Sequence, residues 1–186
     1  MKSHTWRRYG FLLLLVLCGL GRTVALSSET TISSDGAIES VRPGDPASKI
    51  FATFKSHYRI TDETKPGSAR TLTLTVGDRP VVCFSIDGDS RIFLIDVSDV
   101  YRTMENIGNG STLAEVRHVY GKGSVTPTDQ GYLVSFPKLK HIAFLLRNED
   151  IPSNLRDIPD DVFTPRQERR ILSIGNARVV GIQISN

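Results

Sequence analysis

The residues of this chain that could perform chemistry are few, and their spacing is unfavourable for it. Beyond the N-terminal segment the histidines are His57, His118 and His141. None has a second histidine four residues away or a neighbouring cysteine pair, the spacings that bind zinc, so we expect structural or surface roles. Cys83 lies in the strand-like run VVCFSI, which predicts a small buried hydrophobic residue and not a reactive thiol.

Acidic residues gather at two places. Asp87-Gly88-Asp89 resembles the start of a calcium loop, but the later ligands and the closing glutamate are missing, so a tight turn is the better interpretation. The second group could hold calcium, or supply the acid and base of an envelope hydrolase. A solvated loop with Asx-type turns before prolines explains it equally well. Its members are Glu149, Asp150, Asp157, Asp160 and Asp161.

Nucleophile and phosphate-binding motifs are also missing from the sequence. There is no Gly-x-Ser-x-Gly elbow. Gly108-Asn109-Gly110 precedes a predicted helix but lacks the lysine of a phosphate-binding loop. The sequence therefore predicts no catalytic residue, no cofactor and no bound metal, and favours a protein that is not an enzyme.

Residues 1–25 have the organisation of a secretory signal peptide. Lys2, Arg7 and Arg8 precede the apolar stretch 11–20, and small residues end the segment at Ala25, where we predict cleavage; the serines just beyond are the alternative. The Arg7-Arg8 pair also fits a twin-arginine signal, but the very apolar stretch favours the general export route. Leu17 before Cys18 is too large for lipoprotein processing. We expect a periplasmic or secreted protein with no stable membrane anchor.

Removing residues 1–25 changes the charge balance. Four of the 23 Lys and Arg residues and none of the 20 Asp and Glu residues lie there, which leaves 19 positive (23 − 4) and 20 negative side chains. The mature chain therefore gives no reason to expect nucleic-acid binding. Cys83 alone remains, so no intrachain disulfide forms. About 160 residues are enough for one compact domain.

Two short amphipathic segments resemble each other. In the later one Thr112 and Glu115 have capping-box spacing, Leu113, Val116, Val119 and Tyr120 form an apolar stripe, and Gly121 ends the predicted helix 112–120. In the earlier one, at about 46–56, Asp45 is the expected N-cap and Pro46 takes the first helical position. Its stripe is Ala47, Ile50, Phe51 and Phe54, and Gly44 matches Gly110 at an offset of 66.

Three strands are predicted after each helix. They are 70–76, 80–86 and 91–97 in the first set, and 131–136, 141–146 and 177–185 in the second. Alternation in the first strand places Thr71, Thr73 and Thr75 on one face. Together these segments predict an α+β fold: two tandem helix–three-strand repeats that form an antiparallel sheet with helices on one face.

The domain boundaries follow from this repeat. Residues 26–40 are Ser/Thr-rich and are predicted to be a flexible leader. Residues 41–186 form a single domain, with copy one at 41–98 and copy two at 106–186. The second copy carries an insert, 147–174, which the fold does not need, with a short helix expected at 165–172 capped by Thr164.

The motif from Gly110 to Val116, with Tyr120-Gly121 and the strands after it, resembles the SmpA/OmlA outer-membrane assembly lipoprotein superfamily. The tandem form is similar to the β-lactamase inhibitory protein, and the chain also looks like uncharacterised bacterial exported proteins. The lipoprotein cysteine and the inhibitor's disulfides are absent, so the resemblance implies the fold and an exported location, and not β-lactamase inhibition.

We therefore expect a protein-binding or envelope-interaction module whose partner is another envelope protein. The insert differs most between the copies, and its apolar residues recur among prolines and acids, which predicts an ordered segment docked on copy two. The partner-binding residues predicted there are Asp150, Asp157, Asp160, Asp161 and Phe163.

Overall fold

The computed structural model describes residues 31–64, 68–98, 100–156 and 158–186. The helices are α1 (Ser48–Phe54), α2 (Leu113–Tyr120) and α3 (Pro165–Leu172). The strands are β1 (Thr31–Ile32), β2 (Arg59–Glu63), β3 (Arg70–Val76), β4 (Arg79–Ile86), β5 (Ile92–Val97), β6 (Arg102–Thr103), β7 (Ser124–Thr128), β8 (Gly131–Phe136), β9 (Leu139–Leu146) and β10 (Val179–Ser185). The predicted signal peptide and its cleavage site lie outside the described residues. Within the described residues no helix is long and apolar enough to cross a membrane.

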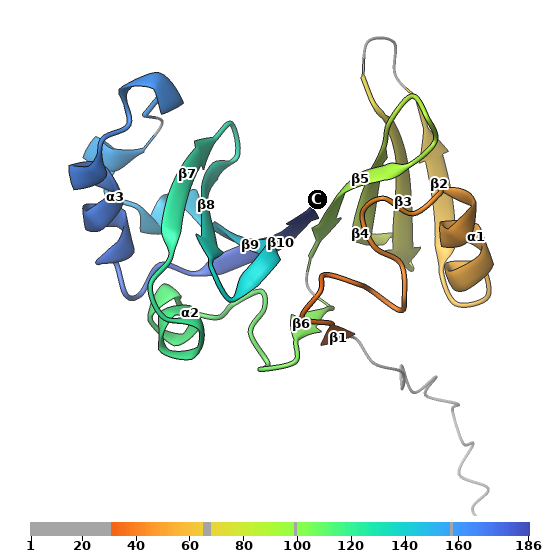
Figure 1. Ribbon diagram of the computed structural model, residues 1–186, viewed down its shortest axis with the longest axis horizontal. Helices are drawn as coiled ribbons and strands as arrows, with labels where there is room; N and C mark the ends of the chain where they lie inside the picture. The colour runs from red at the N-terminus through yellow and green to blue at the C-terminus, as the bar shows by residue number, and fades with distance from the viewer. Residues whose placement is uncertain (1–30, 65–67, 99, 157) are drawn as a thin grey trace, which may run out of the picture.

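One eight-stranded antiparallel sheet organises the fold. Its strand order is β2-β3-β4-β5-β10-β9-β8-β7, so the first half of the chain supplies β2 to β5 and the second half supplies β7 to β10. The halves meet where β5 pairs with β10, with Ile95 opposite Ile184 and Asp96 opposite Gln183. Figure 1 shows the two halves on either side of this seam, with β1 and β6 beneath it.

The α+β class and the antiparallel sheet are confirmed, but the prediction of three strands in each half was wrong. Each half has four, because β2 and β7 precede the predicted strands. Residues 121–130, a loop by composition, contain β7. Proline is compatible with β7 because that strand lies at the edge of the sheet.

Helices α1 and α2 pack on the same face of the sheet through aromatic side chains. The ring of Phe54 in α1 lies 5.9 Å from Phe84 in β4, and the ring of Tyr120 in α2 lies 5.9 Å from Phe144 in β9. The predicted capping box of α2 is confirmed, since Thr112 and Glu115 bond each other's backbone N–H groups. This face, together with the helices, holds the core.

The start of α1 differs from the prediction. The helix begins at Ser48, and Asp45 is not its cap: the Asp45 carboxylate accepts hydrogen bonds from the Arg42 N–H and from Lys49 Nζ. Phe51, predicted to belong to the buried stripe, is 36% exposed. The helix has only seven residues, so its buried stripe is narrower than the sequence pattern indicated.

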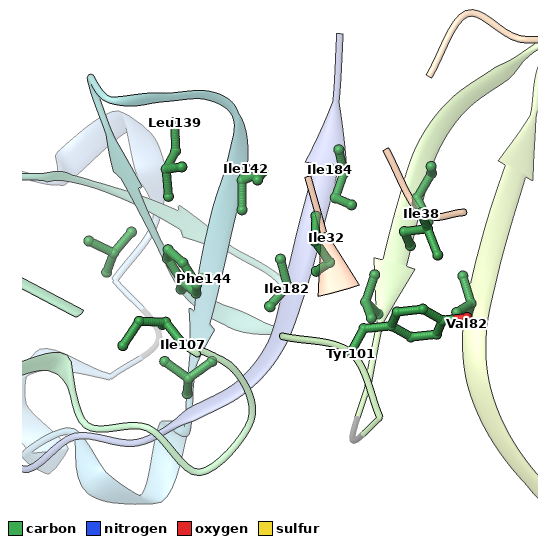
Figure 2. Close-up of a cluster of buried hydrophobic side chains, with 14 of the residues drawn as sticks. Ile32, Ile38, Val82, Tyr101, Ile107, Leu139, Ile142, Phe144, Ile182 and Ile184 are labelled. Atoms are coloured by element: carbon green, nitrogen blue, oxygen red, sulfur yellow. The ribbon is translucent and has the colours of Figure 1, made fainter. Parts of the chain in front are cut away.

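The predicted flexible leader is wrong for residues 31–40. Ile32 and Ile38 are fully buried, and β1 pairs in parallel with β6. Figure 2 shows Ile32 beside Ile182 and Ile184 of β10, and Ile38 on the side of Tyr101 and Val82. Tyr101 donates to Glu39, and its hydroxyl also lies 2.9 Å from that of Tyr58. The segment before α1 is therefore part of the core under the seam.

The insert lies against the second half of the sheet, as predicted. Ile151 and Leu155 are buried, the Phe163 ring packs at a tilt against that of Tyr132 in β8, and the Tyr132 hydroxyl donates to the Leu155 carbonyl. The helix α3 spans 165–172 as predicted, with the Thr164–Gln167 capping box present. Three side chains of this segment, Ile151, Leu155 and Ile171, belong to the core, so the segment adds to the packing of the second half.

Each half contains the same pair of backbone hydrogen bonds at corresponding positions. Gly44 N–H donates to the Ile92 carbonyl, and Gly110 N–H donates to that of Val179. Ala47 N–H donates to Ser90, and Leu113 N–H donates to Ala177. The donors differ by 66 in number (110 − 44, 113 − 47) and the acceptors by 87 (179 − 92, 177 − 90). Gly44 and Gly110 both have positive φ, 90° and 84°, which favours glycine.

Candidate functional site: the open face of the sheet

The face of the sheet opposite α1 and α2 carries the alternate side chains of every long strand, and most of these are half-buried. We call it the open face. Strand register aligns one residue from each strand into a row across the whole sheet. The row is Thr61, Thr73, Cys83, Asp96, Gln183, Ala143, Ser135 and Ser124. All are small or polar, so no large apolar side chain stands along this line.

A hollow of about 280 Å³ lies on the open face at the seam. Its lining comes from β4, β5, β9 and β10, with Ser98 after β5 and Gln130 from the β7–β8 turn: Pro80, Val81, Val82, Cys83, Asp96, Val97, Ser98, Gln130, Leu145, Val180, Gly181, Ile182 and Gln183. Asp96 is the one charged side chain among these described lining residues. The hollow is therefore an apolar depression with a carboxylate in its floor.

Asp96 sits at the centre of the sheet, between Cys83 of β4 and Gln183 of β10. Its partial burial raises its pKa, because the charged form loses hydration, and a hydrogen bond from the Gln183 side chain opposes this by stabilising the carboxylate. A partly desolvated carboxylate lowers the stability of the folded protein when it is charged. Such a group is stabilised when a cation approaches it.

Cys83 opens onto the same hollow, so the prediction that it is a buried hydrophobic residue was wrong: it is half-buried. Partial burial raises the pKa of its thiol, a hydrogen bond with Thr73 lowers it, and the charges of Asp96 and Glu63 raise it further. The net effect keeps the thiol protonated at neutral pH. This is the opposite of the activation that a nucleophilic cysteine requires.

The described acidic side chains of the insert, those of Glu149, Asp150 and Asp161, are not brought together into a metal site. The Asp150 carboxylate accepts from the Arg178 N–H, and Asp161 is exposed. Phe163 is partly buried, and its ring contacts that of Tyr132 at the margin of the core. Asp157 and the side chain of Asp160 lie outside the described residues. Among those described, no three His, Cys, Asp or Glu side chains are placed to hold a metal ion.

The remaining candidates lie apart from the hollow. His57 and His118 are exposed, and His141 Nδ1 lies 3.0 Å from the Ser185 carbonyl. Asp87 closes the predicted tight turn by accepting from the N–H groups of Asp89 and Arg91. These contacts account for the structural roles that the sequence predicted for them.

Sequence reasoning missed Asp96 and Gln183. The segment RIFLIDV is apolar almost throughout, which is typical of a central strand, and β5 is one. The available signal was the single carboxylate inside that apolar run, because an unpaired charge in a central strand is costly. The partner of Asp96 could not be predicted without the β5–β10 register.

No protein-family model and no curated protein sequence matches the chain. Among solved structures it is similar to the uncharacterized protein yfeY from Escherichia coli, with a TM-score of 0.56 and 16% sequence identity. The similarity covers 84% of this chain and 99% of that one. It shows a shared fold, and no more.

Proposed function

We propose that this chain is an exported, non-enzymatic protein that binds another protein through the hollow on the open face of its sheet. The observation that carries the proposal is Asp96, a half-buried carboxylate in an apolar depression at the centre of an accessible sheet face. The occupant that this chemistry favours is a lysine or arginine side chain of the partner.

The hollow offers contacts to both the aliphatic stem and the charged end of such a side chain. The aliphatic stem would contact Pro80, Leu145 and Val180, which line the hollow. The charged end would meet Asp96, whose carboxylate has lost part of its hydration in the free protein. Long basic side chains combine an apolar stem with a charged end, and the hollow offers surfaces for both. Neutral polar residues in the row across the sheet would contact the flanking backbone.

The exported location and the lack of enzymatic activity rest on different observations. Residues 1–25 have the pattern of a cleaved signal, which supports export to the periplasm or beyond. The raised thiol pKa of Cys83 and the internal contacts of Asp150 and Phe163 speak against catalysis at the hollow and at the insert. They favour a binding surface over an envelope hydrolase.

We also propose that the halves are two copies of one helix-and-sheet unit, related to the SmpA/OmlA superfamily. The matching hydrogen bonds of Gly44 and Gly110 support duplication, as does the equivalence of the Phe54–Phe84 and Tyr120–Phe144 contacts. In the two aromatic contacts the helix residues again differ by 66 in number (120 − 54), and the strand residues differ by 60 (144 − 84).

The test uses an array of extended peptides that carry Lys, Arg, Gln or Glu at a central position between apolar residues. The purified protein should bind the Lys and Arg peptides and not the Glu peptides. Asp96→Asn removes the charge with little change in shape and should weaken binding about tenfold or more, as loss of a charged hydrogen bond does.

Asp161→Asn is the matched control, because it removes one exposed negative charge from the insert instead of the hollow. It should leave peptide binding unchanged. Equal loss in both variants would show a non-specific charge effect, and loss only in Asp161→Asn would place the partner surface on the insert. Either result would refute the hollow as the binding site.

A further inference from the structure

The two outer edges of the sheet differ in how far their backbone hydrogen-bonding groups are blocked. An edge strand exposes backbone N–H and C=O groups that can pair with another strand, and proteins usually block them. Strand β7 is one edge and β2 is the other. The insert belongs to the half of the chain that contains β7, and the half that contains β2 has none.

The β7 edge is closed. Helix α3 packs beside it (Figure 1), and the carboxylate of Glu168 in α3 accepts a hydrogen bond from the outward N–H of Val125. Pro127, two residues along the strand, has no N–H to offer. An incoming strand would find the Val125 N–H already bonded to Glu168, and no N–H at Pro127.

The β2 edge carries no such closure. Strand β2 pairs with β3 alone among the described segments, and its five residues include no proline. Arg59 and Glu63 are exposed at its ends. Register with β3 places Arg59, Thr61 and Glu63 on the open face, since Thr61 is opposite Thr73.

The order of charges along β2 is self-complementary. When two β2 strands pair antiparallel around a two-fold axis at Thr61, Arg59 of each copy lies opposite Glu63 of the other. Opposite charges in directly facing cross-strand positions are favourable, and like charges there are unfavourable. We propose that the β2 edge is a self-association site, at which a second copy of this chain pairs its own β2 in this register.

The geometry of such a dimer joins the two sheets without a break. A two-fold axis perpendicular to the sheet keeps facing residues on one side, so the open faces of both copies form one surface. Asp62 takes no part in these cross-strand charge pairs, because its side chain projects to the other face of the sheet. There its Oδ2 lies 2.6 Å from a guanidinium nitrogen of Arg70. The interface is isologous, as in most homodimers.

Sedimentation equilibrium over a range of concentrations tests this, with protein expressed from the full-length chain so that any processing occurs in the cell. The parent protein should pass from monomer to dimer as concentration rises. Arg59→Glu places two glutamates opposite each other at both ends of the pairing, and Glu63→Arg places two arginines opposite each other there. Each variant should dimerise at least about tenfold more weakly than the parent.

The two variants mixed together should recover the parent's affinity as a heterodimer, because every facing pair is then a glutamate with an arginine. This rescue excludes misfolding as the cause of the single-variant losses. Lys55→Glu, an exposed charge reversal in the turn after α1, is the matched control and should leave the dimer intact. A monomer at all concentrations, or a dimer indifferent to Arg59 and Glu63, would overturn the proposal, as would pairing of β2 with a foreign peptide alone.

Discussion

Ile95 lies at the centre of the sheet and offers a direct test of the strand register. It is fully buried on β5, opposite Phe84 of β4 and Ile184 of β10. Its counterpart on β10, Ile182, is 1% exposed, so both isoleucines belong to the core. The substitution Ile95→Ala removes three carbon atoms from a site enclosed on both sides by neighbouring strands.

The expected cost follows from this environment. Transfer of three buried carbon groups is worth about 2.5 kcal/mol. The neighbouring backbones are held by strand pairing and cannot collapse fully into the space, so a cavity term brings the loss to about 3–4 kcal/mol. Ile182→Ala should cost a similar amount, because it faces Phe144 and Val97 in the same arrangement.

Urea denaturation followed by circular dichroism measures the effect, and the denaturant slope should remain that of the parent. Phe93→Ala on the same strand is the control: Phe93 is 41% exposed, so it should lose no more than about 1 kcal/mol. A loss below about 1 kcal/mol for Ile95→Ala would refute the central position assigned to this side chain.

Three further predictions concern the hollow and the insert. Asp96→Asn should raise the free energy of unfolding at neutral pH. Burial raises the pKa of Asp96, so the folded parent protein binds this proton more tightly than the unfolded one. The parent therefore loses stability as pH rises from the pKa of unfolded aspartate through that of Asp96, and the asparagine variant does not. The gain should vanish at acid pH in denaturant titrations, and a gain that persisted there would contradict the electrostatic cause. Cys83 should react with iodoacetamide more slowly than a free cysteine peptide at neutral pH, because its thiol pKa is raised; an equal or faster rate measured by mass spectrometry would be inconsistent with that shift. Replacing 149–163 by a short Gly/Ser bridge should destabilise the fold, because Ile151 and Leu155 complete the core, and an unchanged melting temperature would show that the segment is dispensable.

Local signals were sufficient where they were strong. The Thr112–Glu115 and Thr164–Gln167 boxes located the starts of α2 and α3, because capping chemistry acts within four residues. Long alternating or apolar runs likewise located β3, β5 and β8. The short edge strands β2 and β7 were missed: RITDE and SVTPT have too few apolar residues for a periodic pattern, and only their neighbours in the sheet define them.

Long-range contacts account for the remaining errors. Ile32 and Ile38 stand in a Ser/Thr-rich segment, and nothing in the sequence indicates that both are fully buried. The candidate site depends on the same kind of information. Asp96 and Gln183 are 87 residues apart (183 − 96), and only the seam brings them together.

The position of β10 also constrains how the molecule is made. This strand is synthesised after every other strand of the sheet, yet it occupies a central place, between β5 and β9. Until residues 179–185 are available, β5 has no neighbour on one side and the nascent chain cannot join its halves. Ile95 meets Ile184 across 89 residues (184 − 95), a long loop closure that slows folding. The two halves of the sheet therefore become one only when the last strand has been made.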